Sequence, residues 1–190
     1  MKKTAINLTD GPILRSIIAF AIPIISSNIF QQLYNTADIM IVGRFLGQDS
    51  LAAVGATAAI FELIVGFSLG VGNGMGVIIA RYYGANNHRL LKRAVGATLV
   101  IGAVLSLLVA IIGSFGMYLL LQFLGTPESI IDQSYEYISI VVIGIAVTFA
   151  YNLCAGLLRA VGDSQAALYF LIFSAIVNVF LDILLITTFN

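Results

Sequence analysis

Charged side chains are sparse along the chain and are separated by long apolar runs. Five stretches of 18 to 34 residues contain no Lys, Arg, Asp or Glu. A helix needs about 20 apolar residues to cross the bilayer core, so the 34-residue run is too short for two helices and a turn. The pattern therefore predicts five membrane-spanning helices, over residues 13–43, 51–82, 90–122, 130–159 and 165–188.

The apolar runs lack the alternation that a membrane β-barrel would require. Barrel strands alternate apolar and polar residues over segments of about 10 residues, and the run from Val95 to Leu121 shows no such period. Backbone groups in lipid must then be satisfied within their own helix. The expected fold class is all-α, a polytopic membrane helix bundle, with residues 1–190 forming a single transmembrane domain.

Composition agrees with this fold class and narrows the function. Apolar residues make up 60% of the chain and charged residues 9%, with zero net charge, whereas soluble domains carry about 25% charged residues. The single cysteine, Cys154, is predicted to be a core thiol and excludes an internal disulfide. Without a nucleophile–base set or a cluster of metal ligands, we expect neither an enzyme, nor a cofactor, nor a nucleic-acid partner.

Basic residues gather on one side of the predicted spans. Eight of the nine Lys and Arg residues lie on the side of the N-terminus: Lys2, Lys3, Arg15, Arg81, Arg89, Lys92, Arg93 and Arg159. The other side has only Arg44. Because cytoplasmic loops carry the excess of Lys and Arg, we expect the N-terminus in the cytoplasm and Asn190 outside.

One face of the first predicted helix carries a polar stripe that contains an acid. At 100° per residue, Ser27, Gln31, Tyr34 and Asp38 lie within roughly 60° of arc, with Asn35 beside them. An acid inside a span costs about 2.5–3.5 kcal/mol. It therefore needs either a partner or a function.

Three other predicted helices also carry polar side chains within their spans. They are Glu62 and Asn73 in the second, Thr148 and Asn152 in the fourth, and Ser174, Asn178 and Asp182 in the fifth. We expect these faces to converge on a wet internal cavity.

The alternative is that the polar residues only join helices, at about 0.6–2 kcal/mol per hydrogen bond. Helix joining is favoured for Ser27, Gln31 and Ser174. Asp38 and Asp182 have no basic partner at mid-span, so a proton or sodium site is favoured for them. For Glu62, a position in the cavity and a position at the outer membrane interface both remain open.

Proline and glycine mark two further features of the spans. Pro23 lies inside the first span, where it is either a harmless kink or a bend that changes between states. The glycine-rich run over 66–76 matches no nucleotide-binding fingerprint. We interpret it as close helix packing.

Several blocks of sequence resemble the opening half of the MATE (multidrug and toxic compound extrusion) transporters. They are LTDGPIL at 8–14, QQLYNTAD at 31–38, IVGRFLG at 41–47, LAAVG at 51–55, LRAVGDS at 158–164 and NVFLD at 178–182. The likeness covers nearly all of the chain. It implies the first five helices of the N-terminal lobe in a transporter of two six-helix lobes, located in the plasma membrane, here the bacterial inner membrane.

The resemblance implies export of small cationic or amphiphilic compounds in exchange for protons or sodium, with no other cofactor. The family's cation site matches Tyr34, Asp38, Asn152, Asn178 and Asp182, and sodium is an alternative to a proton at Asp38, Asn178 and Asp182. The kinking proline matches Pro23. Residues expected to line the cavity are Gln31, Asn35, Glu62, Thr148 and Ser174, although Glu62 belongs to no family motif.

Two functions follow as alternatives. In the first, the chain is an N-terminal fragment of an antiporter, for which the missing C-terminal lobe is required. In the second, it is a small membrane protein that does not transport but docks on or regulates a complete transporter. A lipid-linked precursor flippase is a weaker third alternative, because no basic residue lies at mid-span to hold a phosphate.

Overall fold

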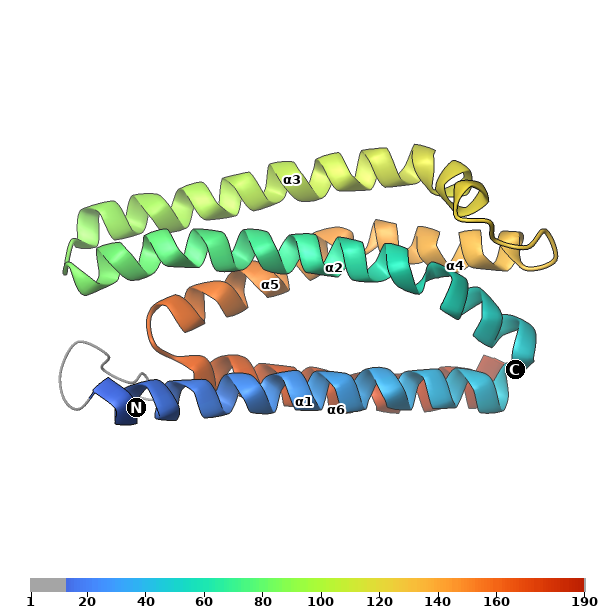
Figure 1. Ribbon diagram of the computed structural model, residues 1–190, viewed down its shortest axis with the longest axis horizontal. Coiled ribbons are helices and arrows are strands. Elements are labelled where there is room, and N and C mark those ends of the chain that lie inside the picture. Colours follow the sequence, from blue (N-terminus) through green and yellow to red (C-terminus); the bar gives the residue numbers. More distant parts are fainter. Residues whose placement is uncertain (1–12, 190) are drawn as a thin grey trace. The chain divides into compact units, whose positions relative to one another are not determined.

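The structure is a computed structural model that describes residues 13–189, and every regular element in this range is an α-helix (Figure 1). The helices are α1 Ile13–Phe45, α2 Gly47–Gly84, α3 His88–Phe123, α4 Ile131–Ile143, α5 Ile145–Ala160 and α6 Ser164–Phe189. Lys2, Lys3, the first five residues of the 8–14 block and Asn190 lie outside the described residues.

The helices fall on the five predicted spans, with one difference in the fourth. The 34-residue uncharged run belongs to a single helix, α3, of 36 residues. Over 130–159, however, the chain forms two helices, α4 and α5, bent by 50°. Gly144 separates them, and its carbonyl accepts a short-range hydrogen bond from the Val147 amide at 3.0 Å.

Residue contacts divide the chain into two compact units. Unit 1 comprises Met1–Phe45 and Leu158–Asn190, and unit 2 comprises Leu46–Leu157. Four helices are long and apolar enough to cross a membrane, and the bent α4–α5 pair qualifies as a fifth crossing. The single-domain organisation stays a prediction.

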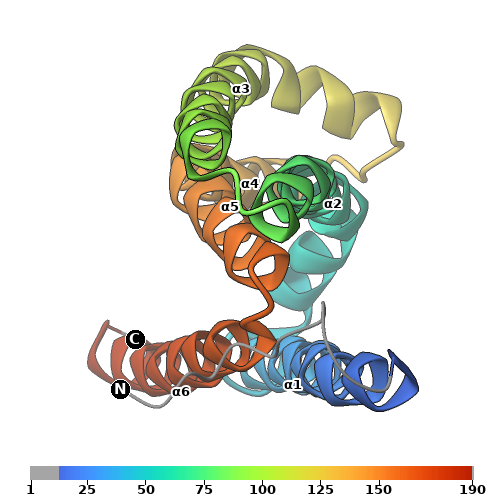
Figure 2. The ribbon, with the colours of Figure 1, turned by 90° about the vertical axis from the view of Figure 1, so that its left-hand side faces the viewer.

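In unit 1, α1 and α6 lie side by side and run in the same direction (Figures 1 and 2). The Ser164 hydroxyl donates to the Phe20 carbonyl at 3.3 Å near their beginnings, and Asp38 contacts Asp182 farther along. Residues 20 to 38 and residues 164 to 182 are both 18 positions apart. The helices therefore keep one register over about 27 Å, most of the thickness of a bilayer core.

The block at 158–164 is the turn that starts this pair. Gly162 has φ +86°, a backbone conformation that favours glycine. The Asp163 carboxylate then accepts a hydrogen bond from the Ala166 amide at 3.0 Å, which caps the N-terminus of α6. These two residues fix where α6 begins, and with it the register against α1.

In unit 2, α2 contacts α3, α4 and α5. The α2–α5 crossing is close because glycines meet there: a Cβ on Gly156 would lie 2.6 Å from the Gly72 carbonyl oxygen. Part of the glycine-rich run thus packs helices, as predicted. Gly66, Gly70 and Gly74 instead face open space, with nothing within 4 Å of an added Cβ.

The buried face of α5 excludes its cysteine. Asn152, Leu153, Ala155 and Gly156 are buried, while Cys154 between them is exposed. The prediction of a core thiol is therefore wrong. Helical periodicity turns Cys154 away from the face that meets α2.

Candidate functional site

Asp38 of α1 and Asp182 of α6 contact each other within unit 1. Their carboxyl groups are close enough for a side-chain hydrogen bond. An ionised carboxylate can only accept hydrogen bonds, so a hydrogen bond between the two groups needs a proton on one of them. A bound cation could replace that proton by neutralising the pair. Two carboxyl groups this close disfavour a charge on both, and the exchange of positive charge at this pair stays a prediction.

Two oxygen atoms beside this contact have no hydrogen-bond partner. Asn178 Oδ1 and Asp182 Oδ2 are both shielded from solvent, and no donor from the described residues reaches either one. Asn178 and Asp182 are four residues apart and share one face of α6. A buried acceptor left without a donor costs about 1–3 kcal/mol. A proton or a sodium ion at this position would satisfy them.

Tyr34 completes the group on α1. It lies one helical turn before Asp38 and interacts electrostatically with both acids. Gln31 and Asn35 are half-buried on the same helix, whereas Ser174 of α6 is exposed. The structure thus brings Tyr34, Asp38, Asn178 and Asp182 together, and their role in cation binding stays a prediction.

Asn152 lies in unit 2, where its side chain joins α5 to α2. Its amide Nδ2 donates to the Ser68 hydroxyl at 2.8 Å and to the Thr148 carbonyl at 3.0 Å. Both Asn152 and Ser68 are buried. The observed contacts of Asn152 are structural, and its place in the cation site stays a prediction.

Ser68 is the partner that the sequence analysis missed. The signal was its spacing: Ser68, Gly72 and Gly76 recur every four residues and form one small-residue face of α2, all of it buried. Such faces let helices approach closely, and a serine among them can form a hydrogen bond with the neighbouring helix.

Replacing Ser68 with Ala is expected to lower the free energy of unfolding by about 1 kcal/mol, because Asn152 loses a buried hydrogen-bond acceptor. Unfolding of the purified chain in mixed micelles would measure this change. Ser114→Ala is the matched control, since Ser114 is exposed and its hydroxyl bonds only to the Ala110 carbonyl of its own helix. Equal effects of the two variants would contradict a structural role of the Ser68–Asn152 contact.

Glu62 and Asn73 are exposed on α2, away from the face that contains Ile60, Ile64 and Ser68. Neither is brought to the acids of unit 1 by a recorded contact. Convergence on a common cavity therefore stays a prediction for them.

Over the described ranges, no three or more His, Cys, Asp or Glu side chains group as a metal site.

Pro23 is buried inside α1, which continues through it as one helix. Proline lacks the N–H that would bond to the carbonyl four residues earlier. The Ser27 hydroxyl donates to the Pro23 carbonyl at 2.8 Å, a type of bond that bends helices. This stretch of α1 is thus locally weakened, as a hinge requires.

Comparison with known proteins gives a consistent result. The MatE family model matches residues 23–184. The probable multidrug resistance protein YoeA of Bacillus subtilis (strain 168) is 36% identical over 165 residues, which are 87% of this chain and 36% of that protein.

Solved structures agree with the family match. A crystal structure of MATE in the bent conformation superposes with a TM-score of 0.90 at 27% identity, covering 100% of this chain and 42% of that one. A crystal structure of MATE in the straight conformation superposes with a TM-score of 0.86 at 26% identity. The match covers 96% of this chain and 40% of that one. The chain thus spans well under half the length of these proteins and matches the fold of their N-terminal lobe.

Proposed function

Because the chain belongs to the MatE family, we propose that it contributes the ion-coupling site of a secondary-active antiporter. The antiporter exports small cationic or amphiphilic compounds in exchange for protons or sodium. The chain is a multi-pass membrane protein of a transporter family. The observation that carries the proposal is the Asp38–Asp182 contact beside two unsatisfied buried oxygens.

The exchange follows from the charge of this pair. When a proton or sodium ion binds Asp38 and Asp182, the site loses negative charge and its attraction for a cationic substrate falls. When the ion leaves, that attraction returns. The two ligands thus bind different states of one site, and their coupling is reciprocal. Asn178 supplies an additional oxygen to the ion, and Tyr34 supplies a hydroxyl.

The other polar residues have a separate part in the proposal. The ion-binding role of Asn152 and the cavity-lining roles of Gln31, Asn35, Glu62, Thr148 and Ser174 stay predictions. The supporting feature is their polarity within apolar helices.

We propose that the protein lies in the bacterial inner membrane with its N-terminus in the cytoplasm. The support is the basic turn between α2 and α3, which carries Arg81, Arg89, Lys92 and Arg93 without a neighbouring acid in sequence.

Replacing Pro23 with Ala is expected to slow transport several-fold while ion binding stays unchanged. Alanine restores the backbone hydrogen bond and stiffens α1 at the position that Ser27 now weakens. Transport rates in proteoliposomes, together with a sodium or proton titration, would separate the two effects. Pro127→Ala, in the exposed α3–α4 connection, is the control. Unchanged transport by the Pro23 variant would contradict the hinge.

The proposed activity is tested by expressing the open reading frame that encodes this chain in bacteria that lack their own efflux pumps. Cells are expected to accumulate less of a cationic dye such as ethidium. Collapse of the proton or the sodium gradient should restore accumulation. Unchanged accumulation with the protein present in the membrane would contradict the proposal.

A second candidate function is docking on a complete transporter as a regulator. The observation that favours it is the open glycine face of α2, at Gly66, Gly70 and Gly74, which a second helix could approach closely. Co-purification with a complete transporter, without transport by the chain itself, would favour this candidate. A monodisperse monomer would contradict it.

A further inference from the structure

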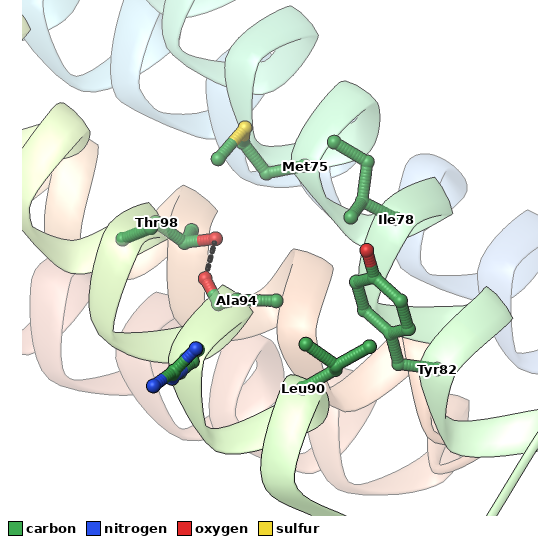
Figure 3. A pocket seen from close by; sticks show the side chains of 8 residues that line it. Met75, Ile78, Tyr82, Leu90, Ala94 and Thr98 are labelled. Carbon is green, nitrogen blue, oxygen red and sulfur yellow. Dashed lines mark hydrogen bonds between the residues drawn. The ribbon is translucent and has the colours of Figure 1, made fainter. Parts of the chain in front are cut away.

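A cavity of about 270 Å³ lies between α2 and α3 in unit 2, far from the acidic pair in sequence. Figure 3 shows side chains from both helices around it. Its lining residues are Met75, Ile78, Tyr82, Leu90, Arg93, Ala94, Ala97 and Thr98. They come from the last part of α2 and the first part of α3, next to the basic turn that joins these helices.

The cavity is apolar along most of its wall and polar at one end. The Thr98 hydroxyl donates to the Ala94 carbonyl at 2.8 Å (Figure 3), so its hydrogen is not offered to a ligand. The polar groups that remain are the Tyr82 hydroxyl and the Arg93 guanidinium. Along their helices, Tyr82 and Arg93 lie nearer the α2–α3 turn than Met75 and Thr98 do.

The charge around the mouth is of one sign. Arg81, Arg89, Lys92 and Arg93 surround the turn, all exposed. Unit 2 contains no Asp or Glu in α2 after Glu62 and none in α3. A cationic substrate would be repelled here, whereas an anion would be attracted without competition from a neighbouring carboxylate.

The volume of the cavity is slightly below that of pockets for drug-sized molecules and leaves room for part of a lipid. Pockets for drug-sized molecules measure about 300–1,000 Å³, so this one holds only part of such a molecule. From Tyr82 to Met75 the wall extends seven residues along α2, about 10 Å from the interface toward the membrane interior. Basic pockets between membrane helices on the cytoplasmic side are known to bind anionic headgroups.

We propose that this cavity binds an anionic phospholipid. Arg93 holds the phosphate, and the groove between Met75, Ile78 and Ala97 holds the first part of one acyl chain. The lipid then bridges α2 and α3 where their polar turn meets the membrane. This site is independent of the proposed transport activity.

The test is a thermal-shift titration of the purified chain with phosphatidylglycerol, and with phosphatidylcholine of the same acyl chains. Ligand that binds the folded state raises the melting temperature with a half-saturation set by its Kd. Work in 1 M salt, where the Debye length is about 3 Å, removes diffuse attraction to the basic turn. The half-saturation concentration of phosphatidylglycerol is expected to be at least about tenfold lower than that of phosphatidylcholine.

Three variants separate the cavity from its surroundings. Arg93→Gln should remove the preference for phosphatidylglycerol, while Lys92→Gln, which makes the same charge change outside the cavity, should retain it. Ala97→Phe should weaken binding without changing any charge, because the ring fills the groove. Inorganic phosphate alone should cause no shift.

Four results would overturn the proposal. They are equal losses in the Arg93 and Lys92 variants, unchanged binding by Ala97→Phe, equal affinity for the two lipids, and a shift with inorganic phosphate that matches the lipid. Each would assign the anion affinity to diffuse charge or to a free anion rather than to a lipid site. Asp38→Asn should bind phosphatidylglycerol as the unchanged chain does, which keeps this test distinct from that of transport.

Discussion

In the complete antiporter to which this chain contributes, replacing either Asp38 or Asp182 with Asn is expected to reduce ion-coupled efflux to the level of membranes without the protein. Asparagine has nearly the same shape as aspartate but carries no charge and cannot take up or release the coupling proton. The contact across α1 and α6 can persist as an amide–carboxyl hydrogen bond, so the chain should still insert in the membrane. Dye efflux from inverted vesicles, driven by a proton or sodium gradient, measures the loss.

The control for these variants is Glu136→Gln, which removes one exposed carboxylate from α4 in unit 2. It should transport at the normal rate. If both aspartate variants export dye normally across the tested range of pH and sodium, the two acids have only a structural role. The double variant should be no worse than either single one, because the pair acts as one site.

Replacing Gly156 with Ala is expected to destabilise unit 2 by about 1–3 kcal/mol. The added Cβ would lie 2.6 Å from the Gly72 carbonyl oxygen and 2.9 Å from its carbonyl carbon. Both are backbone atoms, which cannot move aside as a flexible side chain can. The α2–α5 crossing must therefore separate, and this separation also stretches the hydrogen bond between Asn152 and Ser68. Unfolding in mixed micelles measures the change.

The control here is Gly70→Ala on α2. An added Cβ at Gly70 meets nothing within 4 Å, and alanine is the better helix former by about 1 kcal/mol. This variant should be as stable as the original chain or more so. If Gly156→Ala were equally stable, the close crossing of α2 and α5 would not be needed for the fold.

The parts of the molecule that depend on local spacing could be predicted from the sequence. The charge-free runs mark where the membrane helices lie, because the thickness of the bilayer fixes how many apolar residues each helix needs. The pairing of Asp38 with Asp182 was also accessible, since each acid lies on a polar stripe of its own helix and an unpaired acid is costly in lipid. The resemblance to the family pointed to the same two residues.

The parts that depend on which helix faces meet could not be predicted. Gly144 is one of many glycines in the chain, and nothing in its neighbours marks it as the position where α4 and α5 bend by 50°. The resemblance to the family assigned Asn152 to the cation site, and its contact with Ser68, 84 positions away, was not predicted. Such a contact follows from the approach of α2 to α5, which only the three-dimensional structure specifies.

The central claim is that Asp38 and Asp182 hold one exchangeable positive charge. The most direct measurement is the infrared difference spectrum of the purified chain when sodium is added at low pH, or when the pH is raised without sodium. The account predicts that the unchanged chain loses the signal of a protonated carboxyl group, and that this loss is absent from Asp38→Asn and Asp182→Asn. A loss of the same size in both variants would show that the charge is held elsewhere.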